Sequence, residues 1–296
     1  MMRNIKTLAK LAVFGDPKKG PVAEAIEEFH HFVHGKAEIA VSGCLKECTA
    51  ERVKGCDFAV VFGGDGSIIS AARSLSKVRH GKMPVIGVNL GKLGFLAEFS
   101  LAELEKFFDD IVSGKAPVEK RMMLGCKVLC SSKKQREHFC STAVNDVFIT
   151  AGPPFHMIEL KISVDGQPVA SCISDGLIIA TPTGSTAYNL SAGGPILAGQ
   201  MEAIVITPIC PHSLSFRPIV INADSTIEIS GVQLNTGTTL SIDGHVSLGL
   251  QIDDVVRVAR TETGFLIVNN PARTRWDTLA AKLSWAEKPK YKREID

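Results

Sequence analysis

A short apolar run that ends in a glycine-rich turn limits what this chain can fold into. Residues 57–62 (DFAVVF) are apolar at nearly every position, as expected of a strand that other elements cover on both faces. Gly63-Gly64-Asp65-Gly66-Ser67 follows at once, and apolar residues at helical spacing continue over 67–78. A buried strand, a tight turn and a helix in this order open a βαβ unit, so a parallel sheet is predicted.

The same alternation runs through the first third of the chain. Ser100 and Glu103 form a capping box that predicts where one helix begins. Residues 1–120 are therefore predicted to form an α/β domain with helices on both faces of a parallel sheet. We predict strands over 11–14, 39–41, 57–62 and 83–89, and helices over 22–33, 67–78 and 101–112.

After Lys120 the periodicity changes to that of strands. Residues 157–164 (MIELKISV) alternate cleanly between apolar and polar, and Asp165-Gly166 supplies a hairpin turn. Residues 121–270 are predicted to form a β-rich, sandwich-like domain. Further strands are predicted over 125–130, 143–149, 177–181, 203–207, 218–221, 226–230, 238–242, 255–259 and 265–268, and a last helix over 275–283.

The net charge limits the kind of partner, and the cysteine spacing indicates the cellular compartment. The 33 basic and 31 acidic residues leave a net charge of +2, which argues against a nucleic-acid or anionic-membrane binder. No apolar run approaches the roughly 18 residues of a membrane span. The eight cysteines lack C-x-x-C spacing, so reduced thiols are favoured over a zinc or disulfide framework. We expect a cytoplasmic protein.

The turn at 63–67 carries the sharpest chemical signal. Glycines let backbone N–H groups close on a phosphate, and the start of the next helix adds partial positive charge. The Asp65 carboxylate would repel that phosphate unless the carboxylate bound a metal ion or a hydroxyl group. The alternative is a plain glycine-rich turn with an Asp cap, and we favour function because three glycines bracket one carboxylate.

Other polar clusters also follow or begin predicted strands. Residues 181–191 concentrate hydroxyl and amide groups suited to ribose, base or amide recognition, although an ordinary surface loop has a similar composition. Asn145-Asp146 offers an amide beside a carboxylate. Asp243-Gly244-His245 ends a predicted strand, and a simple hairpin turn explains it nearly as well as a functional role does. Residues 89–95 (NLGKLGF) repeat the strand-then-glycine pattern at what would be a switch point of the sheet.

Together these pieces resemble the NAD kinase family. The matching stretches are GGDGS at 63–67, NLGKLGFL at 89–96, ND at 145–146, DGLIIATPTGSTAYNLSAGGPI at 175–196 and ICPHSLSFRPIV at 209–220. The first is shared with 6-phosphofructokinases and with diacylglycerol and sphingosine kinases, whereas the last two are far more specific. The resemblance implies that residues 271–296 pack back on the first domain and that the dinucleotide lies between the domains.

The resemblance also implies an activity and roles for individual residues. The family transfers the γ-phosphoryl group of ATP, with Mg²⁺ or another divalent cation, to the 2′-hydroxyl of the adenosine ribose of NAD, giving NADP. Asp65 would then be the catalytic residue, and no residue is assigned as a protein metal ligand. The residues implied to bind the cofactor and substrate are Gly63, Gly64, Gly66, Ser67, Phe95, Asn145, Asp146, Asp175, Thr183, Thr186, Ala187, Tyr188 and Ser191.

One position departs from the family pattern, which usually has Asn-Glu where this chain has Asn145-Asp146. The carboxylate is one methylene shorter, so altered affinity is expected more than lost function. Two other hypotheses remain open at this point: a lipid kinase that shares only the GGDG motif, and a non-catalytic dinucleotide sensor. A homodimer or homotetramer is expected, because the family is generally oligomeric. The preference between NAD and NADH is open.

Overall fold

The computed structural model describes residues 8–76, 78–130 and 136–284. The chain divides into two compact units, residues 1–119 with 266–296, and residues 120–265. In the described part of the first unit the elements are β1 (Ala9–Phe14), α1 (Gly20–Val33), β2 (Ala37–Gly43), the 3₁₀ turn η1 (Leu45–Glu47), β3 (Phe58–Phe62), α2 (Asp65–Leu75), the 3₁₀ turn η2 (Val78–Gly81), β4 (Pro84–Val88), α3 (Leu101–Val112), β5 (Val118–Arg121), β18 (Phe265–Val268) and α5 (Arg275–Leu283).

The predicted parallel sheet of the first unit is confirmed. Its strand order is β2-β1-β3-β4-β18-β5, and each neighbouring pair from β2 to β18 is parallel. Helix α2 begins at Asp65 rather than at 67, so the carboxylate lies in the first helical turn. The predicted capping box of Ser100 and Glu103 forms at the start of α3.

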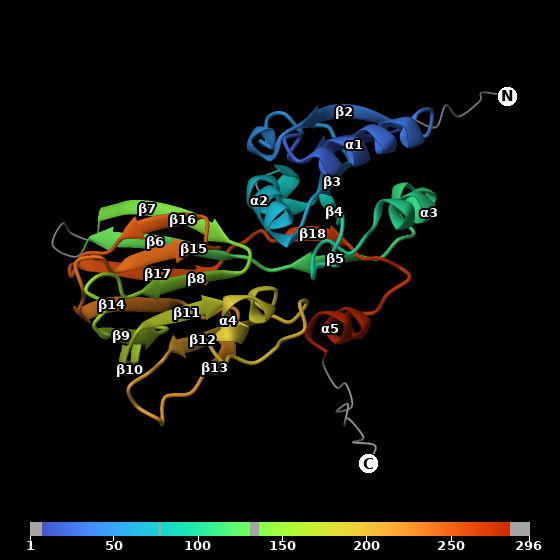
Figure 1. Cartoon of the computed structure of the whole chain (residues 1–296). Helices are drawn as coiled ribbons and strands as arrows, with labels where there is room; N and C mark the ends of the chain where they lie inside the picture. The colour runs from blue at the N-terminus through green and yellow to red at the C-terminus, as the bar shows by residue number, and fades with distance from the viewer. Residues whose placement is uncertain (1–7, 77, 131–135, 285–296) are drawn as a thin grey trace, which may run out of the picture. The chain divides into compact units, whose positions relative to one another are not determined.

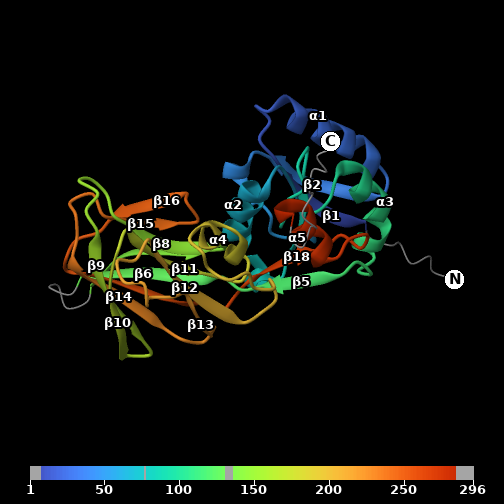
Figure 2. The ribbon, with the colours of Figure 1, turned by 60° about the horizontal axis from the view of Figure 1, so that its bottom comes forward.

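Strand β18 corrects one sequence prediction. We predicted it among the strands of the β-rich domain, but Leu266 and Ile267 pair in parallel with β4 of the first unit. Figures 1 and 2 show β18 alongside β5, with α5 following it in the chain. Four apolar residues (FLIV) predict a buried strand, but nothing in the neighbouring sequence indicates which sheet the strand joins.

An aromatic cluster fixes one face of this sheet. Phe29 of α1 packs on Phe62 of β3 and on Phe108 of α3, with ring centroids 5.6 Å and 6.0 Å apart. All three side chains are fully buried, and each such ring removes roughly 150–250 Å² from water. This core holds the end of β3, from which the glycine-rich turn leaves.

The second unit is a sandwich of two antiparallel sheets, as predicted. The strand orders are β10-β9-β14-β17-β6-β7 and β13-β12-β11-β8-β15-β16. Its elements are β6 (Leu124–Cys130), β7 (Arg136–Ala143), β8 (Asp146–Thr150), β9 (Ile158–Val164), β10 (Gln167–Ser174), β11 (Gly176–Ala180), the 3₁₀ turn η4 (Gly184–Thr186), α4 (Tyr188–Ser191), β12 (Ala203–Ile209), β13 (Ile219–Asn222), β14 (Ile227–Gln233), β15 (Thr239–Ile242), β16 (Val246–Gly249) and β17 (Asp254–Arg260).

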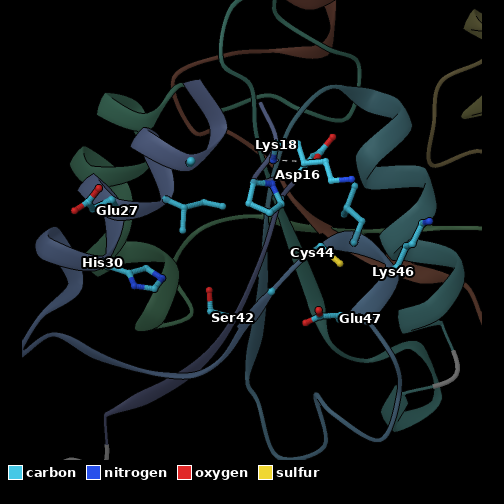
Figure 3. A pocket seen from close by; sticks show the side chains of 14 residues that line it. Asp16, Lys18, Glu27, His30, Ser42, Cys44, Lys46 and Glu47 are labelled. Carbon is cyan, nitrogen blue, oxygen red and sulfur yellow. Dashed lines mark hydrogen bonds between the residues drawn. The ribbon is translucent and has the colours of Figure 1, made fainter. Parts of the chain in front are cut away.

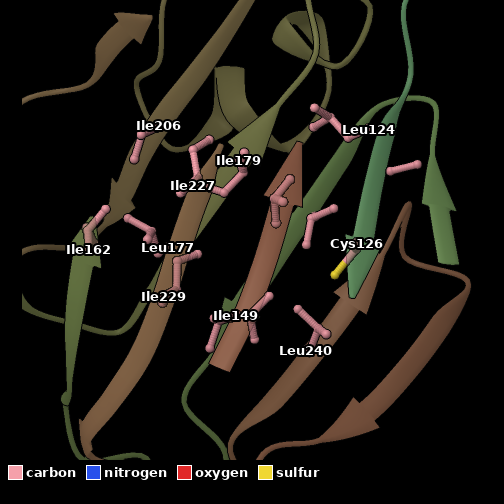
Figure 4. Packing of buried hydrophobic residues seen from close by; sticks show 14 of the residues in the cluster. Leu124, Cys126, Ile149, Ile162, Leu177, Ile179, Ile206, Ile227, Ile229 and Leu240 are labelled. Atoms are coloured by element: carbon pink, nitrogen blue, oxygen red, sulfur yellow. The ribbon is translucent and has the colours of Figure 1, made fainter. Parts of the chain in front are cut away.

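Apolar side chains from both sheets form one core. Leu124 and Ile229 of one sheet face Ile149 and Ile179 of the other, and all are buried (Figure 4). The Asp165-Gly166 hairpin turn between β9 and β10 is confirmed. No helix in the described ranges is both long and apolar enough to cross a bilayer.

Candidate functional site

Gly63, the first residue of the glycine-rich turn after β3, has no room for a side chain. Gly63 has φ +147°, and a Cβ there would overlap the Ser67 hydroxyl, so glycine is required on both counts. The Gly63 N–H donates to the Val88 carbonyl of β4 (2.8 Å), and the Ser67 N–H donates to the Gly64 carbonyl (2.9 Å). These bonds hold Asp65 at the first position of α2.

The Asp65 carboxylate joins two loops that the sequence presents separately. It accepts hydrogen bonds from the backbone N–H groups of Phe95 (2.9 Å), Leu96 (3.0 Å) and Ala97 (3.0 Å). Gly94 permits this approach, since a Cβ there would overlap Asp65 Oδ1. Hydrogen bonds to an ionised acceptor are the stronger kind, so the two glycine-rich motifs form one structure around this carboxylate.

Lys282 is a site residue that the sequence reasoning missed. Its ammonium Nζ lies 3.7 Å from Asp65 Oδ2 and 4.9 Å from the centre of the Phe95 ring. The Lys282 and Asp65 side chains are 30% and 28% exposed, so both groups are partly screened and still open to a ligand. Helical spacing alone gave no reason to single out this lysine.

A second carboxylate braces the Asn145-Asp146 segment. Asp243 accepts hydrogen bonds from the N–H groups of Val144 (3.0 Å), Asn145 (2.7 Å) and Asp146 (3.2 Å). We predicted an unbroken strand over 143–149, but the chain leaves the ladder between β7 and β8, where these N–H groups turn toward Asp243. Asp243 is thus both a turn residue, with φ 50°, and the support of this segment.

Asp146 is buried, with 3% of its surface exposed. Burial is the larger cause and the neighbouring Asp243 charge the smaller one, and together they raise the pKa of Asp146 to about 7. A carboxyl group in this state is poised to change protonation near neutral pH. The environment therefore makes Asp146 sensitive to any hydroxyl group or cation that approaches it.

The loop after β11 is held against Asn145 by hydrogen bonds and close packing. The Thr181 N–H donates to the Asn145 carbonyl (2.8 Å), and the Thr181 hydroxyl donates to the Val144 carbonyl (2.6 Å). Gly184 is packed so closely that a Cβ there would overlap the Asn145 carbonyl. Within the described residues, the buried Thr183 hydroxyl has no hydrogen-bond partner. Buried hydroxyls normally have one, so this group suits a ligand.

Tyr188, the first residue of α4, keeps its ring partly open to solvent. The ring meets Phe148 edge-on, with centroids 5.0 Å apart, and stays 37% exposed. Burial raises the pKa of the Tyr188 hydroxyl, and Asp146 and Asp175 act in the same direction. Asp175 precedes β11 and the 181–191 loop follows it, so the loop folds back to bring Tyr188 within electrostatic reach of both carboxylates.

The predicted residues thus form one group in each unit. Gly63, Gly64, Asp65, Gly66, Ser67 and Phe95 surround the start of α2, whereas Asn145, Asp146, Asp175, Thr183, Thr186, Ala187, Tyr188 and Ser191 lie around β8, β11 and α4. The described residues hold no group of three His, Cys, Asp or Glu side chains that could bind a metal ion. The first group has the features of a phosphate-binding βα turn with a reactive carboxylate, and the second has those of a polar ligand site.

Family models identify the protein class. The ATP-NAD kinase N-terminal domain model matches residues 19–116 and the ATP-NAD kinase C-terminal domain model matches residues 144–270. The NAD kinase of Magnetococcus marinus is 39% identical over 82% of this chain and 78% of its own length. The NAD kinase of Geotalea daltonii is 36% identical over 95% of this chain and 100% of its own.

Solved structures agree with these matches. Yeast NADH kinase complexed with NADH superposes with a TM-score of 0.83 at 27% identity, covering 98% of this chain and 91% of that one. An NAD kinase from Archaeoglobus fulgidus in complex with ATP gives 0.70 at 25% identity, covering 92% and 99%. The chain belongs to the NAD kinase family. Neither the lipid-kinase nor the sensor hypothesis finds support in these comparisons.

Proposed function

We propose that this chain transfers the γ-phosphoryl group of ATP to the 2′-hydroxyl of the adenosine ribose of NAD, giving NADP. The observation that carries the proposal is the Asp65 carboxylate, which is fixed by three backbone N–H groups beside a glycine-rich helix start. The family membership and the two similar structures, one complexed with NADH and one with ATP, support the same reaction.

We assign Asp65 as the acceptor of the proton that the ribose 2′-hydroxyl loses. Phosphoryl transfer passes through a loose transition state, so the proton leaves late and needs only a well-placed acceptor. The N–H groups of residues 64–66 at the start of α2 would face phosphate oxygens, where the helix dipole favours negative charge. Lys282, 3.7 Å from Asp65, would orient this carboxylate, which makes it a positioning residue.

A divalent cation fits the residues present. Mg²⁺ is commonly held by one or two carboxylates together with substrate phosphates rather than by an all-protein cage, and Asp65 offers one partly exposed carboxylate at the phosphate-binding turn. When bound, Mg²⁺ neutralises charge on the phosphoryl oxygens.

The dinucleotide is assigned to the group of polar residues in the second unit. Asn145 and Asp146 suit a base edge and ribose hydroxyls, the unpartnered Thr183 hydroxyl suits another polar group, and Tyr188 offers a ring face for stacking. Phe95, Asp175, Thr186, Ala187 and Ser191 complete the proposed contacts. The partners are NAD or NADH and ATP, without nucleic acid or membrane, in a homodimer or homotetramer. The described residues contain no disulfide bond, which suits the cytoplasm.

A coupled assay for NADP formation tests this proposal. Purified protein is given NAD or NADH with ATP, other nucleoside triphosphates or polyphosphate, each with and without Mg²⁺. We expect NADP or NADPH with at least one donor and none without a divalent cation. If no donor gives either product, the proposed reaction is wrong.

Replacing Gly94 by alanine is expected to reduce turnover by about tenfold or more, because the new methyl group overlaps Asp65 Oδ1 and must displace the carboxylate. Gly91→Ala is the matched control in the same loop, since nothing lies within 4 Å of its added Cβ. Steady-state kcat for NADP formation is measured for both variants. Equal loss in the two variants, or none in either, contradicts the importance of the Asp65 position.

A further inference from the structure

Lys282 carries an ammonium group whose hydrogen-bonding capacity the folded chain leaves unused. Within the described residues this ammonium makes no hydrogen bond, and its one ion pair, with Asp65 Oδ2, spans 3.7 Å. An ammonium group has three N–H donors, and the Lys282 side chain remains 30% exposed. Its donors are therefore open to a ligand that approaches Asp65.

Helix α5 places this lysine beside the glycine-rich turn. A capping box fixes where the helix begins. Thr278 and Leu279 are buried, and Lys282 follows them by four and three positions, so it lies on the same face of the helix. Its Nζ is 4.9 Å from the centre of the Phe95 ring, at a distance where a cation–π contact is favourable. A packed helix and an aromatic ring thus hold the ammonium next to Asp65.

The two oxygens of the Asp65 carboxylate differ in how many hydrogen bonds they accept. Oδ1 accepts the N–H groups of Leu96 and Ala97, whereas Oδ2 accepts only that of Phe95. Each carboxylate oxygen has about two lone-pair sites, so Oδ2 keeps one for a substrate hydroxyl. Lys282 is paired with this same oxygen. The cation therefore lies beside the atom that is left to accept the hydroxyl proton.

The distances bring the transferred phosphoryl group within reach of the ammonium. A hydroxyl that donates to Oδ2 lies about 2.7 Å from it, and the phosphorus that the hydroxyl attacks lies about 3–3.5 Å farther on. The phosphorus is then about 6 Å from Oδ2, whereas Nζ is 3.7 Å from the same atom. Lysine has a flexible four-carbon stem, so a rotation of the side chain brings its N–H donors to a phosphoryl oxygen.

No other cation in the described part of the chain forms an ion pair with Asp65. Lys18 and Lys46 of the same unit line a hollow between α1 and the ends of β1 and β2 (Figure 3), and no residue of the turn at 63–67 borders that hollow. Enzymes that transfer phosphoryl groups commonly place a cation where charge develops in the transition state. At the Asp65 carboxylate, Lys282 is the residue that can take this role.

We propose that Lys282 contacts the transferred phosphoryl group and stabilises its negative charge, which makes it a catalytic residue in addition to its effect on Asp65. The bond from the ribose oxygen to phosphorus forms while the bond from phosphorus to the oxygen of ADP breaks, and ADP leaves with that electron pair. The hydroxyl proton passes to Asp65. The ammonium donates hydrogen bonds to the phosphoryl oxygens and neither gives nor takes a proton. This inference rests on the proposed function.

Lys282→Gln is expected to lower kcat for NADP formation by about 100-fold, a loss typical of removing one donor that stabilises the transition state. KM for ATP and for NAD should change by less than about threefold, because the contact is made chiefly in the transition state. Lys106→Gln is the matched control: Lys106 is exposed on α3 of the same unit, and its Nζ lies 5.2 Å from the centre of the Phe107 ring. Equal kcat values for the two variants contradict the inference.

A double variant separates contact with the phosphoryl group from an effect on Asp65. If the lysine acted only by orienting the carboxylate, Asp65→Asn would already remove that effect, and adding Lys282→Gln would cost nothing further. We expect instead a further loss in kcat of about 30-fold, with NADP quantified by mass spectrometry over hours. A double variant as active as Asp65→Asn alone overturns the inference.

The donor ATPγS gives a measurement that does not depend on how much of a variant is folded. Sulfur is a weaker hydrogen-bond acceptor than oxygen, so the ratio of kcat with ATP to kcat with ATPγS should be smaller for Lys282→Gln than for wild type. An unchanged ratio overturns the inference. Wild-type protein that forms NADP at the same kcat as Lys282→Gln removes only this inference, whereas wild-type protein that forms no NADP removes the proposed function.

Discussion

Asp65→Asn is expected to lower kcat for NADP formation by about three orders of magnitude, the middle to upper part of the range for removal of a general base. Asparagine keeps the size of the side chain and one acceptor oxygen for the N–H groups of residues 95–97. It removes the negative charge that accepts the hydroxyl proton. The dissociation constant of NAD should change by less than about threefold, because the dinucleotide contacts are assigned to residues other than Asp65.

Steady-state kinetics and calorimetric titration with NAD together check this result. Asp109→Asn is the matched control, because Asp109 is an exposed carboxylate on α3 of the same unit. Asp65→Ala, which leaves the three N–H groups without their acceptor, should lose as much turnover and also some thermal stability. Turnover of Asp65→Asn within about threefold of wild type would refute the role assigned to this carboxylate.

Asp146→Asn is expected to stabilise the protein at alkaline pH while weakening NAD binding. The pKa of Asp146 is raised to about 7 from an ordinary 3.8, so the folded state holds this proton more tightly than the unfolded state does. The stability linked to that proton is complete below pH 3.8 and is lost as the pH rises through 7. A shift of this size corresponds to about 4 kcal/mol above pH 7, which asparagine would restore.

Urea denaturation at pH 5 and pH 8 measures this effect. The free energy of unfolding of Asp146→Asn minus that of wild type should be larger at pH 8 by about 2–3 kcal/mol. Asp253→Asn is the control, since Asp253 is exposed in the same unit. A pH-independent difference would show that the group does not titrate in this range. Calorimetry should show weaker NAD binding by Asp146→Asn, because its amide replaces the proposed acceptor for ribose hydroxyls.

The parts of the structure that depend on neighbours in sequence could be predicted. The run at 57–62, its glycines and the helix after them form β3, the turn and α2, because each signal acts within a few residues. The Asp165-Gly166 hairpin is equally local. Strands with exposed polar faces were missed, namely β7 (Arg136–Ala143), β10 (Gln167–Ser174) and β16 (Val246–Gly249), because pairing with a neighbour rather than apolar alternation defines them.

Contacts between distant segments could not be predicted from the chain. Lys282 meets Asp65 across more than two hundred positions of sequence, and nothing in its own helix distinguishes it from other exposed lysines. Asp243 was weighed as a simple turn, since only the folded chain places its carboxylate against the N–H groups of 144–146. Asp65 and Asp146 themselves were singled out from the sequence, although the groups that contact them in the folded chain were not.

The late return of the chain to its first sheet has a consequence during synthesis on the ribosome. Residues 1–119 are made first, yet β18 and the lysine beside Asp65 come from residues beyond 265. The first unit therefore cannot finish its sheet until the whole second unit has been translated. A chain released early by a stalled ribosome, or clipped before α5, would carry the glycine-rich turn without its lysine. The pairing of Asp65 with Lys282 can therefore form only in chains translated through α5.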